Sequence, residues 1–203
     1  MGTVHIMLNC NDKRNKPWLS TSPPIMPPLR DLVPQTLHTP RLTLSLFNRS
    51  PEHYRHLISL LETLAPALNS HTPSAFDIWT AESPLHDPRL PGGVQDQPLL
   101  YLAFSDGSFI GVIGLQQRHN PKLPPDLGWS ILSAYQGRGY ATEGAKEVLR
   151  FAREEFALRE VVAICEIGEG GRVSRRVAEK VGFEEGELVE REGGEGWRVM
   201  RLL

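Results

Sequence analysis

The chain has 203 residues, of which 40% are hydrophobic and 23% are charged, and its formal net charge at pH 7 is −2. This composition is typical of one globular α/β domain with an additional segment, and without a basic surplus nucleic acid is not an expected partner. The two cysteines, Cys10 and Cys165, are far apart in sequence, which argues against a disulfide framework and predicts a reduced, cytoplasmic protein. The apolar runs are shorter than the roughly 18 residues of a membrane span, so no membrane partner is expected.

The first 38 residues differ in composition from the rest of the chain. Six prolines interrupt any regular element there: Pro17, Pro23, Pro24, Pro27, Pro28 and Pro34. We therefore expect residues 1–38 to form an irregular or partly disordered arm, and residues 39–203 to form the domain. Two interpretations of the arm stay open, one in which it packs on the domain or on a second subunit and one in which it is a disordered tail.

The first elements of the domain are a strand and a helix. Residues 42–47 alternate between apolar and polar, which predicts a half-buried strand. Ser50 followed by Pro51 is typical of a helix start. A second helical segment is predicted around residues 76–79, and the Pro- and Gly-rich residues 83–97 are predicted to be loop.

The second half of the domain alternates strands and helices. Apolar runs over 99–104 and 109–115 flank Asp106-Gly107, which indicates a β-hairpin. The remaining predicted elements follow in chain order: a strand over 126–132, a helix from 141 to about 156, a strand over 161–167, a short helix over 170–181, and a strand pair over 184–190 and 197–203.

The stretch Gln136–Ala141 lies between a predicted strand and the long helix. A Gly-rich turn that opens a helix presents free backbone N–H groups and the positive end of the helix dipole, and so favours phosphate binding. Two familiar phosphate loops do not fit. The Walker loop requires Lys where Ala145 stands, and the dinucleotide fingerprint requires Gly or Ala where Thr142 stands.

The pattern that fits this stretch is Gln/Arg-x-x-Gly-x-Gly/Ala, and it resembles the acetyl-CoA pyrophosphate loop of the GCN5-related N-acetyltransferase (GNAT) family. Residues 174–183 are similar to a segment of the RimJ/RimL-type subfamily, which includes ribosomal-protein N-terminal acetyltransferases. The order of elements over residues 39–203 resembles the same fold. The resemblance implies an α/β fold with a mixed, mostly antiparallel central sheet flanked by helices, and a cofactor cleft between two central, splayed strands.

The resemblance also implies which residues bind acetyl-CoA. They are three residues of the strand before the loop, the residues of the loop and of the first helical turn, and one glycine of the last helix: Trp129, Ile131, Leu132, Gln136, Gly137, Arg138, Gly139, Tyr140, Ala141, Thr142 and Gly171. The family usually has Asn where Gly171 stands, and that Asn caps the helix and contacts the cofactor arm. We expect Gly171 to serve as an N-cap, while the lost amide weakens pantetheine binding or widens the cleft.

Two residues are candidates for the chemistry, because many relatives have a Tyr acid where this chain has Ala178. Ser174 is the candidate to hydrogen-bond the departing CoA sulfur, and the alternative is that it only caps its helix. Glu166 is the candidate general base, acting through water on a protonated amine. The alternative is that Glu166 only faces outward on an exposed strand face.

For the remaining charged residues the sequence does not assign a role in catalysis. The cations of the last helix, Arg172, Arg175, Arg176 and Lys180, would either meet the cofactor's 3′-phosphate or form a solvated face. Glu143 is expected to be structural, since a carboxylate in the first turn favours the helix dipole. The histidines lack ligand spacing, so no metal site is expected.

Together these features predict an acetyl-CoA-dependent N-acetyltransferase that moves an acetyl group to a primary amine by direct transfer in a ternary complex. The alternative is an acyl-CoA-binding relative without acetyltransferase activity, because the residues at 171 and 178 depart from the family pattern. A nucleotide-binding α/β protein is disfavoured by the two failed loop patterns. The acceptor, a small molecule or a protein N-terminus, depends on residues 50–97, and the protein is expected to be a monomer or a homodimer.

Overall fold

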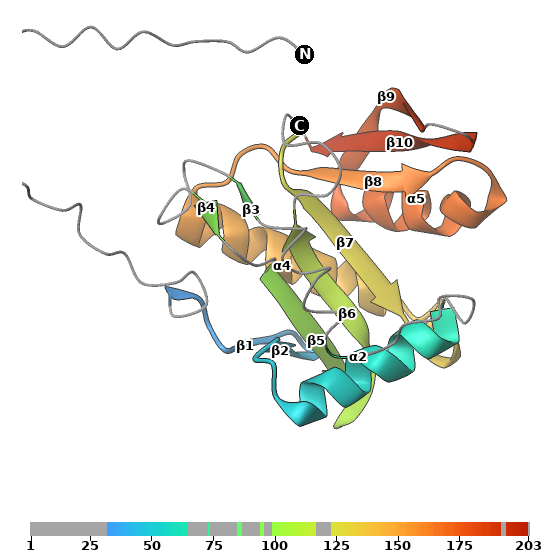
Figure 1. Cartoon of the computed structure of the whole chain (residues 1–203). Helices are drawn as coiled ribbons and strands as arrows, with labels where there is room; N and C mark the ends of the chain where they lie inside the picture. Colours follow the sequence, from blue (N-terminus) through green and yellow to red (C-terminus); the bar gives the residue numbers. More distant parts are fainter. Residues whose placement is uncertain are drawn as a thin grey trace, which may run out of the picture.

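The computed structural model describes residues 32–64, 99–116, 123–191 and 194–202, together with short pieces at 73, 85–86 and 94–95. A central sheet of eight strands runs through the domain (Figure 1). Its strands, in spatial order, are β1 (Thr36–His38), β2 (Thr43–Leu46), β5 (Leu99–Ser105), β6 (Ser108–Gln116), β7 (Asp126–Ile131), β8 (Val162–Glu166), β10 (Gly194–Leu202) and β9 (Phe183–Arg191). All neighbours are antiparallel except β7 and β8, so the expected mixed, mostly antiparallel sheet is confirmed.

Helices cover both faces of the sheet. Helix α2 (Pro51–Leu64) packs on one face, where its Leu57 joins Leu100 and Leu102 in a small core. Helices α4 (Tyr140–Phe156) and α5 (Glu169–Val181) pack on the other face over the main core (Figure 1). None of the described helices is long and apolar enough to cross a membrane.

Two elements predicted from local sequence patterns, the start of α2 and the β5–β6 hairpin, are confirmed. The N–H of His53 donates to Ser50 Oγ at 3.2 Å, so Ser50 caps α2 as its position before Pro51 predicted. In the β5–β6 hairpin Asp106 and Gly107 have φ of 50° and 75°, the left-handed geometry of a tight two-residue turn.

The structure differs from the sequence-based elements at the start of the domain and in the loop over 83–97. Strand β1 lies inside the segment that we expected to be irregular, because Thr36–His38 pair with β2 at its edge. Within 83–97, β3 (Leu85–His86) and β4 (Val94–Gln95) pair with each other. These strands have only two or three residues each, too few to show the alternation of apolar and polar residues that identifies a strand in a sequence. The predicted helical segment at 76–79 and residues 1–31 of the arm lie outside the described residues.

The two central strands β7 and β8 diverge after a single point of contact. In the described residues they pair only at Asp126 and Val162, and the N–H of Val162 donates to the Pro125 carbonyl at 3.0 Å. Beyond that point β7 stays paired with β6, and β8 stays paired with β10. The sheet is therefore open between β7 and β8, which agrees with the two splayed central strands that we expected.

Candidate functional site

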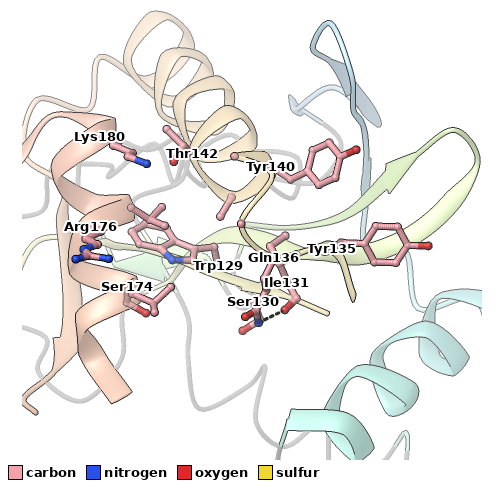
Figure 2. A pocket seen from close by; sticks show the side chains of 15 residues that line it. Trp129, Ser130, Ile131, Tyr135, Gln136, Tyr140, Thr142, Ser174, Arg176 and Lys180 are labelled. Carbon is pink, nitrogen blue, oxygen red and sulfur yellow. Dashed lines mark hydrogen bonds between the residues drawn. The ribbon is translucent and has the colours of Figure 1, made fainter. Parts of the chain in front are cut away.

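A pocket of about 330 Å³ lies where β7 and β8 diverge (Figure 2). Its lining comes from the end of β7, from the loop that leads into α4, and from one face of α5. Its opposite sides are the loop side, residues 135–142, and the α5 side, residues 173–180.

The loop side presents backbone N–H groups. Gly137 and Gly139 have φ of 75° and 82°, a left-handed geometry that glycine adopts without strain. Gly139 is the N-cap of α4, with no side chain capping the helix. In the described part of the chain, the N–H groups of residues 137–142 have no protein acceptor. Unpaired N–H groups at a helix N-terminus favour an anionic ligand.

One side chain of the loop ties it to the strand before it. Gln136 Nε2 donates to the Ile131 carbonyl at 2.7 Å and so ties the loop to the end of β7 (Figure 2). The Arg138 guanidinium lies 5.6 Å from the centre of the Tyr135 ring, and the N–H of Leu132 donates to the Ile110 carbonyl at 2.9 Å. Neither Arg138 nor Leu132 lines the pocket.

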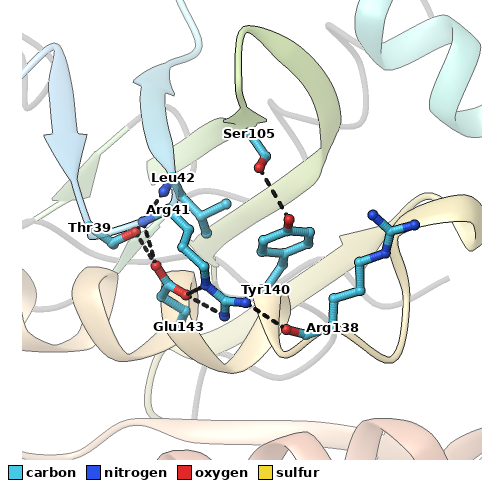
Figure 3. A network of polar contacts seen from close by, with 7 residues as sticks. All are labelled: Thr39, Arg41, Leu42, Ser105, Arg138, Tyr140 and Glu143. Atoms are coloured by element: carbon cyan, nitrogen blue, oxygen red, sulfur yellow. Dashed lines mark hydrogen bonds and ion pairs between the residues drawn. The ribbon is translucent and has the colours of Figure 1, made fainter.

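Glu143, one turn into α4, is held by residues that precede β2 (Figure 3). Thr39 Oγ1 donates to Glu143 Oε1 at 2.6 Å, and Arg41 Nε donates to Oε2 at 2.6 Å. Burial alone raises the pKa of Glu143, but the hydrogen bonds from Thr39 and Arg41 outweigh it and hold the pKa below its usual value. Its interactions are therefore structural, as expected.

The start of α5 differs from the expectation for Gly171. The N-cap is Gly168, with φ of 91° and ψ of −166°, whereas Gly171 is buried inside the first turn and does not line the pocket. A Cβ on Gly171 would lie 1.7 Å from the Glu166 carbonyl oxygen, so only glycine fits. The expected capping role of Gly171 is wrong, because α5 begins before this position and packs closely on the end of β8.

Ser174 lies on the α5 side, where its side chain lines the pocket (Figure 2). It is the sixth residue of α5, so it does not cap the helix. Among the described residues its hydroxyl has no hydrogen-bond partner. Ala178, at the position of the family's tyrosine acid, is completely buried in the main core.

The four cations of α5 divide into two pairs. Arg172 forms an ion pair with Glu169 at 2.7 Å, and Arg175 donates to the carbonyl oxygen of Glu166 at 2.8 Å. Arg176 and Lys180 line the pocket, and neither has a protein partner within the described ranges. Spacing in the sequence does not separate the pairs, because Arg172 is also four residues from Arg176.

Further lining residues were not predicted from the sequence: Ser130, Tyr135, Val173 and Val177. Val173 is 58% exposed. The spacing of 173, 176, 177 and 180 is a single helical stripe. Recognising that stripe as a pocket side required knowing which face of α5 is turned toward the loop.

Glu166 lies at the end of β8 with an exposed side chain, and it does not line the pocket. Ala163 and Cys165 of the same strand pack into the main core beneath α4 and α5. Because side chains alternate along a strand, Glu166 faces the opposite side of the sheet, the side of α2. Among the described residues, no group of three His, Cys, Asp or Glu could hold a metal ion.

The family model for the acetyltransferase (GNAT) domain matches residues 34–184, and the chain therefore belongs to the GNAT family of acyltransferases. A relative from Bacillus subtilis (strain 168), named "Putative ribosomal N-acetyltransferase YdaF", is 35% identical over 82 residues. That alignment covers 40% of this chain and 44% of the relative, so the chain matches less than half of that relative's length.

The fold is similar to those of solved acetyltransferase structures. An acetyltransferase from Agrobacterium tumefaciens str. C58 is 25% identical, with a TM-score of 0.61, over 84% of this chain and 95% of its own. RimL, described as a ribosomal L7/L12 alpha-N-protein acetyltransferase in complex with coenzyme A, is 13% identical, with a TM-score of 0.56, over 81% of this chain and 95% of its own. The second likeness concerns the fold alone.

Proposed function

We propose that this protein transfers the acetyl group of acetyl-CoA to a primary amine, by direct transfer in a ternary complex. The observation that carries the proposal is the set of unpaired N–H groups over residues 137–142, which faces two unpartnered cations, Arg176 and Lys180, across one pocket. No carboxylate lines this pocket in the described residues. Such a site suits a ligand with several phosphate groups, and CoA carries three.

The open edge of β7 supports binding of the pantetheine arm. The N–H of Leu132 donates toward β6, and backbone groups alternate in direction along an antiparallel strand. The backbone groups of Trp129 and Ile131 are therefore directed toward the cleft. The Ile131 carbonyl is taken by Gln136, so Trp129 offers the donor and acceptor that an extended amide chain would pair with, like an added strand.

The two candidate catalytic residues lie on different faces of the sheet. Ser174 is on the α4–α5 face, beside the pocket that would hold the donor, and its hydroxyl would donate to the CoA sulfur as the thioester breaks. Glu166 is directed toward the α2 face, from which the acceptor would approach. There its carboxylate would take the amine proton through a water molecule. Holding donor and amine on opposite faces of one cleft would supply much of the rate by proximity.

Thermal unfolding with different nucleotides tests the donor assignment. CoA should raise the melting temperature, whereas ATP and NAD should not. A ligand at 100 times its Kd stabilises the folded state by about 2.7 kcal/mol. The absence of any shift with CoA would contradict the proposal.

A screen for thiol release from acetyl-CoA tests the transfer and the acceptor. Peptides with free N-termini belong in the screen because the Bacillus relative is named as a ribosomal N-acetyltransferase. Small amines form the second arm of the screen. CoA binding without turnover on either arm would instead favour the alternative, an acyl-CoA-binding relative without acetyltransferase activity.

We also propose that the protein is located in the cytoplasm and is a monomer or a homodimer.

A further inference from the structure

Arg41, which precedes β2, contacts the phosphate-binding loop from outside the pocket (Figure 3). Its Nη1 donates to the carbonyl oxygen of Arg138 at 2.9 Å. Its guanidinium carbon lies 4.8 Å from the centre of the Tyr140 ring. Its Nε donates to Glu143 at 2.6 Å. A single side chain thus spans the loop and the first turn of α4.

The carboxylate of Glu143 is itself fixed, so Arg41 has a firm anchor. Besides the side-chain bonds, Glu143 Oε1 accepts from the backbone N–H of Arg41 at 3.0 Å. Thr39 Oγ1, which donates to the same oxygen, accepts from the N–H of Leu42 at 2.9 Å. The carboxylate of Glu143 therefore joins the turn before β2 to the start of α4 through three hydrogen-bond donors, Thr39 Oγ1, the Arg41 N–H and Arg41 Nε.

The contact with the Arg138 carbonyl has a consequence for the pocket. In a trans peptide unit the carbonyl oxygen and the following N–H point in opposite directions. The carbonyl of Arg138 is turned toward Arg41, away from the pocket, so the N–H of Gly139 in the same peptide unit is turned toward it. Gly139 lines the pocket. A reversed peptide would present a carbonyl oxygen, which repels phosphate, where a donor now stands.

We infer that Arg41 is a positioning residue that fixes the orientation of the Arg138–Gly139 peptide so that its N–H faces the phosphate-binding side of the pocket. The inference rests on the proposed function of that pocket. Arg41 acts through the loop and does not touch the reacting atoms. It therefore contributes equally to the ground state and the transition state, which changes the KM for the donor and not kcat.

Arg41→Lys tests this, because lysine keeps the charge but lacks the planar guanidinium whose separate Nε and Nη1 donors reach Glu143 and the Arg138 carbonyl. Glu143→Gln is a second variant that weakens the anchor. The matched control is Arg150→Lys, which removes a guanidinium on the exposed face of α4 that bonds Glu147 at 2.7 Å and also pairs with Glu154. The probes are CoA, dephospho-CoA, which keeps the pyrophosphate, and pantetheine, which lacks it.

For Arg41→Lys and Glu143→Gln we expect the Kd of CoA to rise about tenfold, the loss of roughly one charge-assisted hydrogen bond. The Kd of dephospho-CoA should rise by the same factor, whereas the Kd of pantetheine, measured by NMR titration, should not change. With an amine acceptor, the KM for acetyl-CoA should rise while kcat stays within about twofold. Arg150→Lys should match the wild type.

Two results would overturn the inference: unchanged CoA affinity in both variants, or equal losses for CoA and pantetheine, which would indicate a general structural role. A wild-type protein that does not bind CoA would instead overturn the proposed function. The two failures are therefore distinguishable.

Discussion

The loop side of the pocket offers backbone N–H groups held in place by distant residues, whereas the α5 side offers free side chains. On the loop side, Gln136 Nε2 donates a hydrogen bond to the Ile131 carbonyl at the end of β7, and the Arg138 carbonyl accepts one from Arg41. On the α5 side Ser174, Arg176 and Lys180 have no protein partner in the residues that the structure describes. The loop side is therefore a fixed surface of backbone donors, whereas the α5 side consists of side chains that can adjust their positions.

The largest expected effect concerns the chemistry at the end of β8 and on the α5 side. Glu166→Gln should lower kcat by about 10²-fold or more, because general-base catalysis contributes this much, while CoA affinity stays the same. Ser174→Ala should lower kcat by a smaller factor. Steady-state assays with the amine found in the acceptor screen provide the measurement. Unchanged turnover in Glu166→Gln would exclude its role as base.

Gly139→Asp should abolish ligand binding on the loop side. A Cβ on Gly139 would lie 3.4 Å from Arg41 Nη2, so the carboxylate would compete for that guanidinium and oppose the ligand's charge beside the loop. The stabilisation of about 2.7 kcal/mol by CoA at 100 times its Kd should therefore disappear. Gly107→Asp is the control, since Gly107 also has positive φ, 75°, with no atom within 4 Å of its Cβ position, but lies in the β5–β6 hairpin. A thermal shift with CoA that persists in Gly139→Asp would show that phosphate does not bind the loop.

Gly171→Asn restores the family's usual residue at the start of α5 and should nevertheless destabilise the fold. The new Cβ would lie 1.7 Å from the Glu166 carbonyl oxygen, and the backbone shift that relieves this contact costs about 1–3 kcal/mol. Urea unfolding provides the measurement. Gly137→Asn, where nothing lies within 4 Å, should cost less. Equal stability of Gly171→Asn and the wild type would mean that α5 can begin later without penalty.

The cations of the α5 side should distinguish CoA from dephospho-CoA. Arg176→Ala or Lys180→Ala should weaken CoA binding by roughly 0.5–1 kcal/mol and leave dephospho-CoA binding unchanged, because partly exposed charges contribute little each. Arg172→Ala, which removes a cation paired with Glu169, is the control for calorimetric titration. Equal losses for both ligands would place these side chains at the pyrophosphate instead.

The smallest effect lies far from both sides, at His53 in α2. Burial lowers the pKa of His53; the nearby charge of Glu52 raises it by less, and that of His56 lowers it further. The Nδ1 of His53 accepts a hydrogen bond from the N–H of Asn48. Since the folded state disfavours the proton, the free energy of unfolding should decrease as the pH falls below about 6.5, the usual pKa of histidine. His53→Gln should flatten this slope in pH-dependent urea titrations. An unaltered slope would assign it to other groups.

Much of the fold could be predicted from local patterns. Asp106-Gly107 indicated the hairpin, Ser50-Pro51 indicated the start of α2, and Gly182 ends α5 with φ of 118°. The position of the true N-cap, Gly168, could not be predicted, because it depends on how closely α5 approaches the end of β8. In the site, the N–H groups of residues 137–142 followed from the glycine pattern, whereas the bond from Arg41 to the Arg138 carbonyl joins residues 97 apart in sequence.

The sequence by itself determined the order of the longer elements and the Gly-rich loop, because these depend on turn chemistry and periodicity within a few residues, and the motifs in it resemble those of the family that the comparisons show. The tertiary structure decided which cations of α5 border the pocket, that Glu166 faces the α2 side, and that Gly171 lies within a helix. The physical reason is that each of these depends on the packing of one element against another. The turn before β2 likewise reaches the loop only after β2 and α4 have packed on the same sheet.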